Sequence, residues 1–94
     1  MPDVTTSRIS GTVSDASGAP LPGVTVTATN EESGAQSPAV TDEHGFYRIL
    51  NLPIGTYTIT ATLEGFATAI HPNVRLLLGS TPVINFTLQR SSGS

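Results

Sequence analysis

The 94-residue chain contains no cysteine, no lysine and no tryptophan. Without cysteine it can form neither disulfides nor thiolate metal sites. Only 12% of its residues are charged and the net charge is −3, so it has no basic face for nucleic acid. No run approaches the roughly 20 apolar residues that a membrane span requires. The first residues lack the basic and apolar segments of a signal peptide, so we expect either a cytoplasmic protein or one whose signal has been removed.

What the sequence does contain is typical of a small folded domain. Hydrophobic residues make up 37% of the chain, which is too many, with too little charge, for intrinsic disorder. A chain of this length forms one domain and buries only about 60–65% of the surface that its unfolded form exposes. A single core is therefore expected, and a deep enzyme cleft is not.

The stretch Thr41–Tyr57 combines two turns with two apolar runs. Asp42–Gly45 has turn chemistry, because the aspartate can accept from N–H groups two residues on and glycine tolerates positive φ. Phe46–Leu50 reads as a strand, and Pro53 with Gly55 ends it. Residues 57–63 then alternate apolar residues with threonines, which indicates a half-buried strand. The stretch predicts one β-hairpin.

Similar alternation recurs along the chain, and no segment has helical periodicity. Pro38 suggests that its strand lies at a sheet edge, and Pro72 is expected to interrupt the segment 67–78. The predicted strands cover residues 8–14, 24–29, 36–41, 46–50, 57–63, 74–78 and 84–88. Seven short strands separated by regular turns predict an all-β, single-domain sandwich of two sheets with threonine rows facing water. The expected inward residues are Ile9, Val13, Val24, Val26, Tyr47, Ile49, Leu52, Tyr57, Ile59, Ala61, Phe66, Leu76, Ile84, Phe86 and Leu88.

Several short motifs occur in a characteristic order. They are ISGTV at 9–13, Asp15 followed by GAPLPGVTV at 18–26, TD with GFY at 41–47, LP with GTY at 52–57, and GF at 65–66. In this order and spacing the chain resembles the carboxypeptidase regulatory-like domain family, which is related to the collagen-adhesin B-type repeats. The resemblance covers roughly residues 9–88, which is nearly the whole predicted domain.

The resemblance implies a seven-stranded Greek-key β-sandwich of the transthyretin-like, Ig-like kind. It also implies a non-catalytic accessory module of a larger bacterial envelope or secreted protein, such as the N-terminal extension of a TonB-dependent receptor. The module would then act as a structural spacer or a protein-interaction domain outside the cytoplasm. Its partners would be other domains of the parent chain or another protein, without membrane insertion, and the domain alone would be a monomer. The internal isopeptide bond of the collagen-adhesin relatives needs lysine and cannot form here.

The motif residues themselves have structural explanations. Turn glycines and core aromatic residues account for all of them. We therefore expect a role in the fold, not in a site, for Gly18, Gly23, Gly45, Leu52, Gly55, Tyr57, Gly65 and Phe66.

Candidates for chemistry are few, and we predict no enzyme activity, no catalytic residues and no cofactor. Asp42 and Glu43 are weak metal-ligand candidates, because the loop alone supplies too few oxygens for calcium. No Gly-x-Ser-x-Gly elbow exists. An ester bond between threonine and Gln36 or Gln89 is compatible with composition, although nothing in the sequence activates either glutamine.

Two functional readings stay open. An interaction module could use residues 67–78, with Leu77 as an unpaired apolar side chain, or a sheet edge at residues 36–41 that accepts a strand unless Pro38 protects it. The alternative is a ligand-binding sandwich for carbohydrate or a small molecule, which the lack of tryptophan disfavours. In either case we expect residues 1–6 to be disordered, 7–90 to form the domain, and 91–94 to be a linker or cloning remnant.

Overall fold

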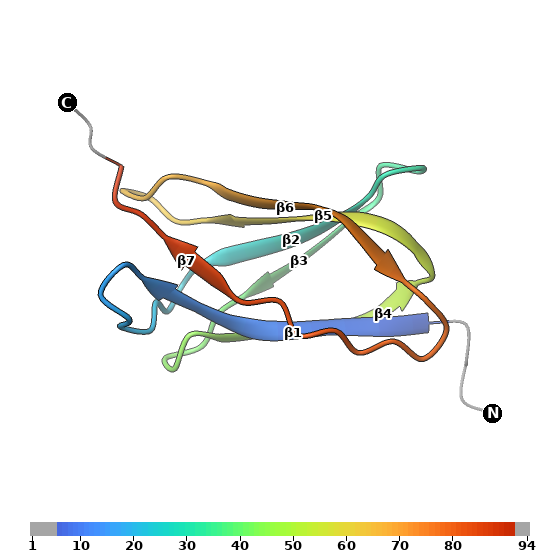
Figure 1. Ribbon diagram of the computed structural model, residues 1–94, viewed down its shortest axis with the longest axis horizontal. Helices are drawn as coiled ribbons and strands as arrows, with labels where there is room; N and C mark the ends of the chain where they lie inside the picture. Colours follow the sequence, from blue (N-terminus) through green and yellow to red (C-terminus); the bar gives the residue numbers. More distant parts are fainter. Residues whose placement is uncertain (1–5, 92–94) are drawn as a thin grey trace.

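The computed structural model describes residues 6–91, and these form seven strands and no helix. The strands are β1 (Thr6–Asp15), β2 (Thr25–Asn30), β3 (Gln36–Val40), β4 (Phe46–Pro53), β5 (Gly55–Thr62), β6 (Ala69–Leu76) and β7 (Phe86–Leu88). They make a three-stranded sheet in the order β4-β1-β7 and a four-stranded sheet in the order β3-β2-β5-β6, packed as two layers (Figure 1). The predicted seven-stranded Greek-key, Ig-like sandwich is confirmed.

The domain boundaries at residues 7 and 90 stay predictions, and described residues near both of them are hydrogen-bonded into the sandwich. Thr6 already belongs to β1, and the Ser91 N–H donates to the Gly65 carbonyl at 3.0 Å. The other residues of the predicted terminal segments, 1–5 and 92–94, lie outside the described part of the chain. β1 begins at one end of the long axis and β7 points toward the other (Figure 1). No helix among the described residues is long and apolar enough to cross a membrane.

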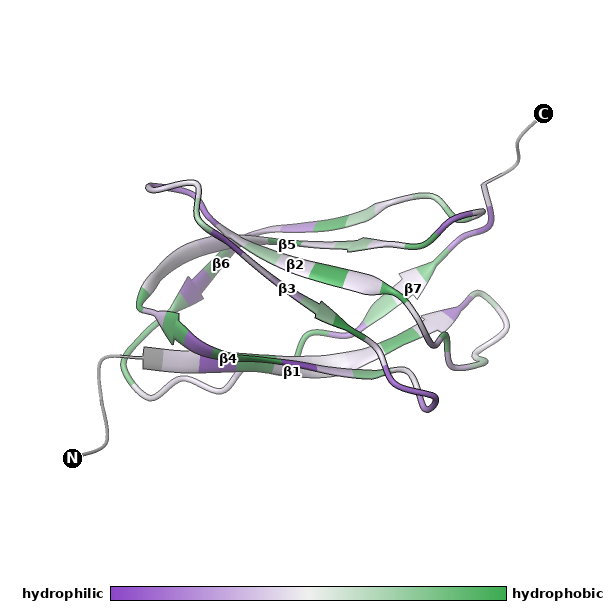
Figure 2. Ribbon diagram, turned by 180° about the vertical axis from the view of Figure 1, so that it is seen from behind, coloured by the Kyte–Doolittle hydropathy of each residue, from purple (hydrophilic) through white to green (hydrophobic). Residues whose placement is uncertain are grey.

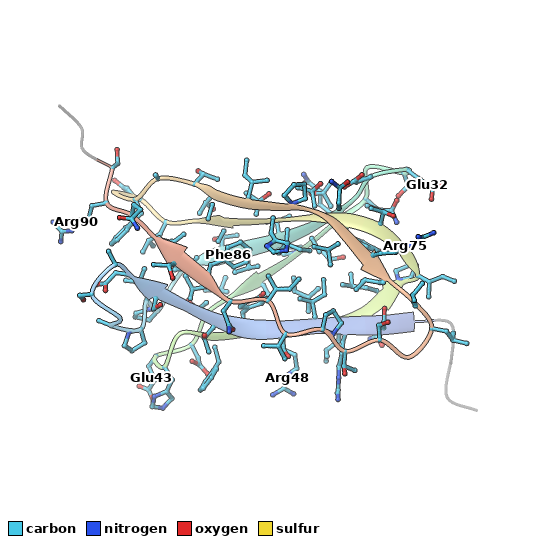
Figure 3. All side chains as sticks on the ribbon, viewed as in Figure 1. Glu32, Glu43, Arg48, Arg75, Phe86 and Arg90 are labelled. Carbon is cyan, nitrogen blue, oxygen red and sulfur yellow. The ribbon has the colours of Figure 1, made fainter. Side chains whose placement is uncertain are left out.

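The core fills the space between the two sheets. Apolar and polar positions alternate along the strands (Figure 2), and Phe86 lies between the layers (Figure 3). The threonines of β2 and β5 are half-buried or exposed on the opposite face and pair across the strands, as in Thr27 with Thr60. The buried apolar set is Ile9, Val13, Val24, Val26, Ala28, Tyr47, Ile49, Leu52, Tyr57, Ile59, Ala61, Val74, Leu76, Ile84, Phe86 and Leu88.

This core differs from the predicted one at three positions. Phe66 is only partly buried and packs against the margin of the core, whereas the prediction placed it inside. Ala28 and Val74 are buried but were absent from the predicted set. The alternation of β2 already contains Ala28, and Val74 lies on the same face of β6 as the predicted inward residue Leu76.

The predicted hairpin of β4 with β5 is wrong. β4 pairs with β1, while β5 pairs with β2 and β6, so the link between β4 and β5 crosses from one sheet to the other. Gly55 takes a φ of 150° in this link, and the Tyr57 hydroxyl donates to the Pro53 carbonyl at 2.7 Å. Proline and glycine are compatible both with a hairpin turn and with a link that passes from one sheet to the other. The local sequence does not distinguish the two, because the outcome depends on which distant strands β4 and β5 pair with.

The predicted break at Pro72 is also wrong. β6 spans Ala69–Leu76 and includes Pro72, whereas the prediction began the strand at residue 74. The pairing with β5 shifts register between Tyr57 and Ile59, and Asn73 takes a φ of 60° opposite that shift. β6 is an edge strand, and proline is tolerated there next to a bulge.

β1 and the segment before β7 approach each other closely at Gly11. A side-chain carbon on Gly11 would lie 2.7 Å from the Ile84 carbonyl carbon and 3.1 Å from Cε1 of Tyr47. The Tyr47 hydroxyl donates to the Ile84 carbonyl oxygen, and Ile84 N–H donates to the Ser10 carbonyl at 2.8 Å. Burial raises the pKa of Tyr47 well above its ordinary value, so the hydroxyl stays a donor. Gly11 does not have a positive φ, so backbone conformation does not require glycine there. Close packing does, because any side chain would clash with Ile84.

Candidate functional site

Two loops carry the carboxylates that the sequence singles out. Oδ1 of Asp42 accepts from the N–H groups of His44 at 2.8 Å and Phe46 at 3.0 Å. Oδ1 of Asp15 accepts from the hydroxyl and N–H of Ser17, at 2.6 and 2.9 Å. The Phe46 N–H holds the pKa of Asp42 below its ordinary value, and the Ser17 hydroxyl does the same for Asp15. Both carboxylates therefore stabilise turns.

These loops do not assemble a metal centre. Glu43 and His44 are exposed, with 3.8 Å between Oε1 of Glu43 and Nε2 of His44. Among residues 6–91 no group of three or more histidine, aspartate or glutamate side chains could hold a metal ion. Gln36 and Gln89 are both exposed, so neither has the buried surroundings that would favour an ester cross-link.

The motif residues lie where backbone geometry or packing uses them. Gly45 shows this best, because its φ is +77° and a side-chain carbon would lie 2.6 Å from the Val13 carbonyl oxygen. The others also have positive φ, namely Gly18, Gly23, Gly55 and Gly65. Leu52 and Tyr57 are buried in the core, and Phe66 packs against its margin. The arrangement favours a structural role for the whole set.

The outward face of β4 carries large apolar side chains that the sequence reasoning treated only as part of a strand. Phe46 and Leu50 are 54% and 50% exposed, while Tyr47 and Ile49 between them are buried. The signal was present in the sequence, because Phe46–Leu50 has apolar residues at both parities and only one parity can face the core.

Phe46 lines a shallow depression of about 850 Å³ over the three-stranded sheet. Val40 and Val83, which are 62% and 66% exposed, also line it. Arg8 and Arg48 contribute their charges, and Asp42 is the carboxylate among its lining residues. The depression therefore combines apolar and cationic character on a protein whose net charge is −3.

The sheet edge at residues 36–41 is less suited to receive a strand. β3 is an edge strand, as Pro38 predicted. At the two ends of the β2–β3 ladder, Thr41 N–H donates to Val24 O and Asn30 N–H donates to Ala35 O. Main-chain groups of an antiparallel pair point toward and away from the partner at alternate residues, so those of Pro38 point away from β2. Proline has no N–H, so this edge lacks a donor at its centre.

A second apolar group lies at the end of the sandwich where β1 begins. Leu77 is 59% exposed, as expected for an unpaired apolar residue, and Leu78 and Ile54 are similarly exposed. Continuing the register of Gly55 with Leu76 sets Ile54 beside Leu77.

These features define an Ig-like β-sandwich module whose polar loops stabilise turns and whose outward face carries exposed apolar residues. The family model for the carboxypeptidase regulatory-like domain matches residues 8–89, and the chain belongs to that family.

Among curated proteins, the TonB-dependent transporter Oar of Myxococcus xanthus is 40% identical over 83 residues. This match covers 87% of the chain but only 8% of the transporter. The chain thus spans a small fraction of that relative's length.

Solved structures show the same fold. A chain of a type II cohesin–X-dockerin complex from Acetivibrio cellulolyticus is 25% identical with a TM-score of 0.69, and the match covers 89% of this chain and 58% of that one. Chlorocatechol 1,2-dioxygenase from Pseudomonas putida is 13% identical with a TM-score of 0.73, covering 92% and 61%. A streptococcal ancillary pilin is 18% identical with a TM-score of 0.69, covering 95% and 34%. The last two likenesses concern the fold alone.

Proposed function

We propose that this chain is a non-catalytic accessory module of a larger bacterial envelope protein, of the kind represented by TonB-dependent transporters. The observation that carries the proposal is the 40% identity to a transporter of which the chain corresponds to only 8%. A module of that size contributes spacing or protein contacts, and its solvent-facing carboxylates Asp15 and Asp42 are engaged in turns.

The ligand-binding alternative has less support. Carbohydrate platforms expose several aromatic rings, whereas Tyr47 and Tyr57 are buried and each donates its hydroxyl to a main-chain carbonyl. Among the described Phe and Tyr residues only Phe46 is more than half exposed. A small-molecule channel of the transthyretin kind needs an oligomer, so light scattering after size exclusion tests it directly. We expect a monomer.

The complete open reading frame provides the first test, and a TonB-dependent transporter domain downstream of this module is expected. An in-frame deletion of residues 8–89 should then leave the remaining protein in the outer-membrane fraction while altering its transport or its partner contacts. A zinc peptidase upstream, or a reading frame that encodes this domain alone, would contradict the proposal. A hydrolytic activity of the isolated domain would contradict its non-catalytic part.

A further inference from the structure

Hydrogen bonds determine which main-chain groups of β4 face β1. Val13 N–H donates to Gly45 O at 2.8 Å across the ladder, whereas Phe46 O accepts from Asp42 N–H on the opposite side. Main-chain groups alternate in direction along a strand, so those of Arg48 also point away from β1. Leu50 follows Ile49 at a register irregularity, where neither Leu50 nor Asn51 has a partner in the described β1–β4 ladder.

The opposite strand confirms this parity. Ser10 is the register partner of Arg48, and Ser10 N–H donates to Pro82 O, on the side of β1 away from β4. Within the described part of the chain β4 pairs with β1 alone. The N–H and C=O groups of Arg48 therefore lie at an open sheet edge, and unlike Pro38 on the β3 edge, Arg48 retains its N–H donor.

The side chains above this edge alternate in chemistry. Phe46, Arg48 and Leu50 all face outward from the three-stranded sheet, so an apolar, a cationic and an apolar position follow one another. Figure 3 shows the Arg48 side chain projecting away from both layers. We call Phe46, Arg48 and Leu50, with the open main chain of Arg48, the β4 rim.

The positive charge near the β4 rim favours an acidic partner. Arg8 lies on the same outward face of β1, and two of the chain's four arginines thus line one depression although the net charge is −3. The carboxylate in that lining, Asp42, is already bonded to two N–H groups. Among the described residues no carboxylate forms an ion pair with Arg8 or Arg48, so an incoming acidic side chain can pair with their guanidinium groups.

From these observations we propose that the β4 rim receives an extended acidic polypeptide segment as a fourth strand of the β4-β1-β7 sheet. Alternate residues of an added strand stand beside alternate residues of β4. The segment therefore carries an apolar residue beside Phe46, a carboxylate beside Arg48 and an apolar residue beside Leu50. Main-chain bonds supply affinity and the side-chain pattern supplies specificity. The inference deepens the proposed accessory role and rests on it.

The test uses the isotopically labelled 94-residue protein and the blocked peptide Ser-Val-Thr-Glu-Thr-Val-Ser. We expect chemical-shift changes along β4 and slower hydrogen exchange of the Arg48 amide on binding. Replacing the peptide's glutamate by lysine, or introducing Arg48→Glu, should weaken binding about tenfold, which corresponds to about 1.4 kcal/mol. The lysine peptide should bind the Arg48→Glu variant better than it binds the original protein.

Arg75→Glu is the matched control, because Arg75 is exposed on β6 of the other sheet (Figure 3). This substitution changes the net charge by the same amount as Arg48→Glu. It should alter affinity less than about twofold. The inference is overturned if the acidic peptide does not bind or if Arg48→Glu has no larger effect than Arg75→Glu. Unchanged exchange of the Arg48 amide, shifts centred on Gln36–Val40, or a free protein that dimerises through β4 would overturn it equally. Any of these results would leave the accessory role standing, since deletion in the parent protein tests that role separately.

Discussion

Replacing Gly11 by alanine tests the close approach between β1 and the segment before β7. The added carbon would lie 2.7 Å from the Ile84 carbonyl carbon and 3.1 Å from the Tyr47 ring, so the two segments must separate. Overpacking of this kind costs about 1–3 kcal/mol, occasionally more. Separation also deprives the buried Ile84 carbonyl of its tyrosine donor, which costs about 1–3 kcal/mol more.

The expected total for Gly11→Ala is about 1–5.5 kcal/mol after a gain of about 0.4–1 kcal/mol from a stiffer unfolded chain. For a domain of this size that lowers Tm by about 5–40 °C. Urea unfolding followed by far-ultraviolet circular dichroism measures the change in the free energy of unfolding.

A second glycine separates packing from backbone strain. Gly34 has a φ of +76°, and a side-chain carbon added there would have no atom within 4 Å, so Gly34→Ala introduces strain without a clash. Gly34→Ala should lower the free energy of unfolding by about 1 kcal/mol. This is the cost of placing alanine in the left-handed region, less the stabilisation that alanine gives by restricting the unfolded chain. If Gly11→Ala costs no more than Gly34→Ala, the close approach at Ile84 does not constrain the fold and the reasoning fails.

Three further outcomes are expected. Ile59→Ala, and Tyr57→Ala, should each cost about 3–5 kcal/mol in the same assay, and losses below about 1 kcal/mol at both would contradict their burial. The pKa values of Asp15 and Asp42 are lower in the folded than in the unfolded protein. Their contribution to stability is therefore complete at pH values above the unfolded-state pKa, and it is lost as the pH falls through the folded-state pKa. Asp42→Asn should make the free energy of unfolding less dependent on pH in acid. Mass spectrometry should give the mass of the sequence, whereas a deficit of one water or ammonia would indicate an internal cross-link.

Alternation was a sound guide to the core because both sheets bury one face. Apolar residues face inward and threonines outward without interruption along β2 from Thr25 to Thr29 and along β5 from Tyr57 to Thr62. The prediction weakened where a bulge lies within a strand, as at Asn73, whose φ of 60° accompanies the continuation of β6 through Pro72 back to Ala69. A bulge depends on the partner strand, so the sequence of β6 alone does not contain it.

Partner choice was the other element that local sequence left undetermined. The residues between β4 and β5 contain turn chemistry, yet β4 pairs with β1, which lies far earlier in the chain. The crossing allows Leu52 and Tyr57 to be buried together in one core. Only packing over the whole domain selects the crossing over a hairpin, because both conformations satisfy the same proline and glycine.

The same logic separates the residues that maintain the fold from those of the proposed β4 interface. Gly11, Gly45 and Tyr57 are each committed to a close approach, a turn or a buried hydroxyl bond, so a change at any of them perturbs the fold first. Phe46 and Arg48 carry no such commitment, since their side chains face solvent and β1 contributes only small polar neighbours, Thr12 and Ser10, at the paired positions. Partner specificity at the proposed β4 rim can therefore change at little cost in stability, because these side chains lie outside the core. Substituting them should alter binding while leaving the unfolding midpoint nearly unchanged, which is the opposite of the behaviour expected at Gly11.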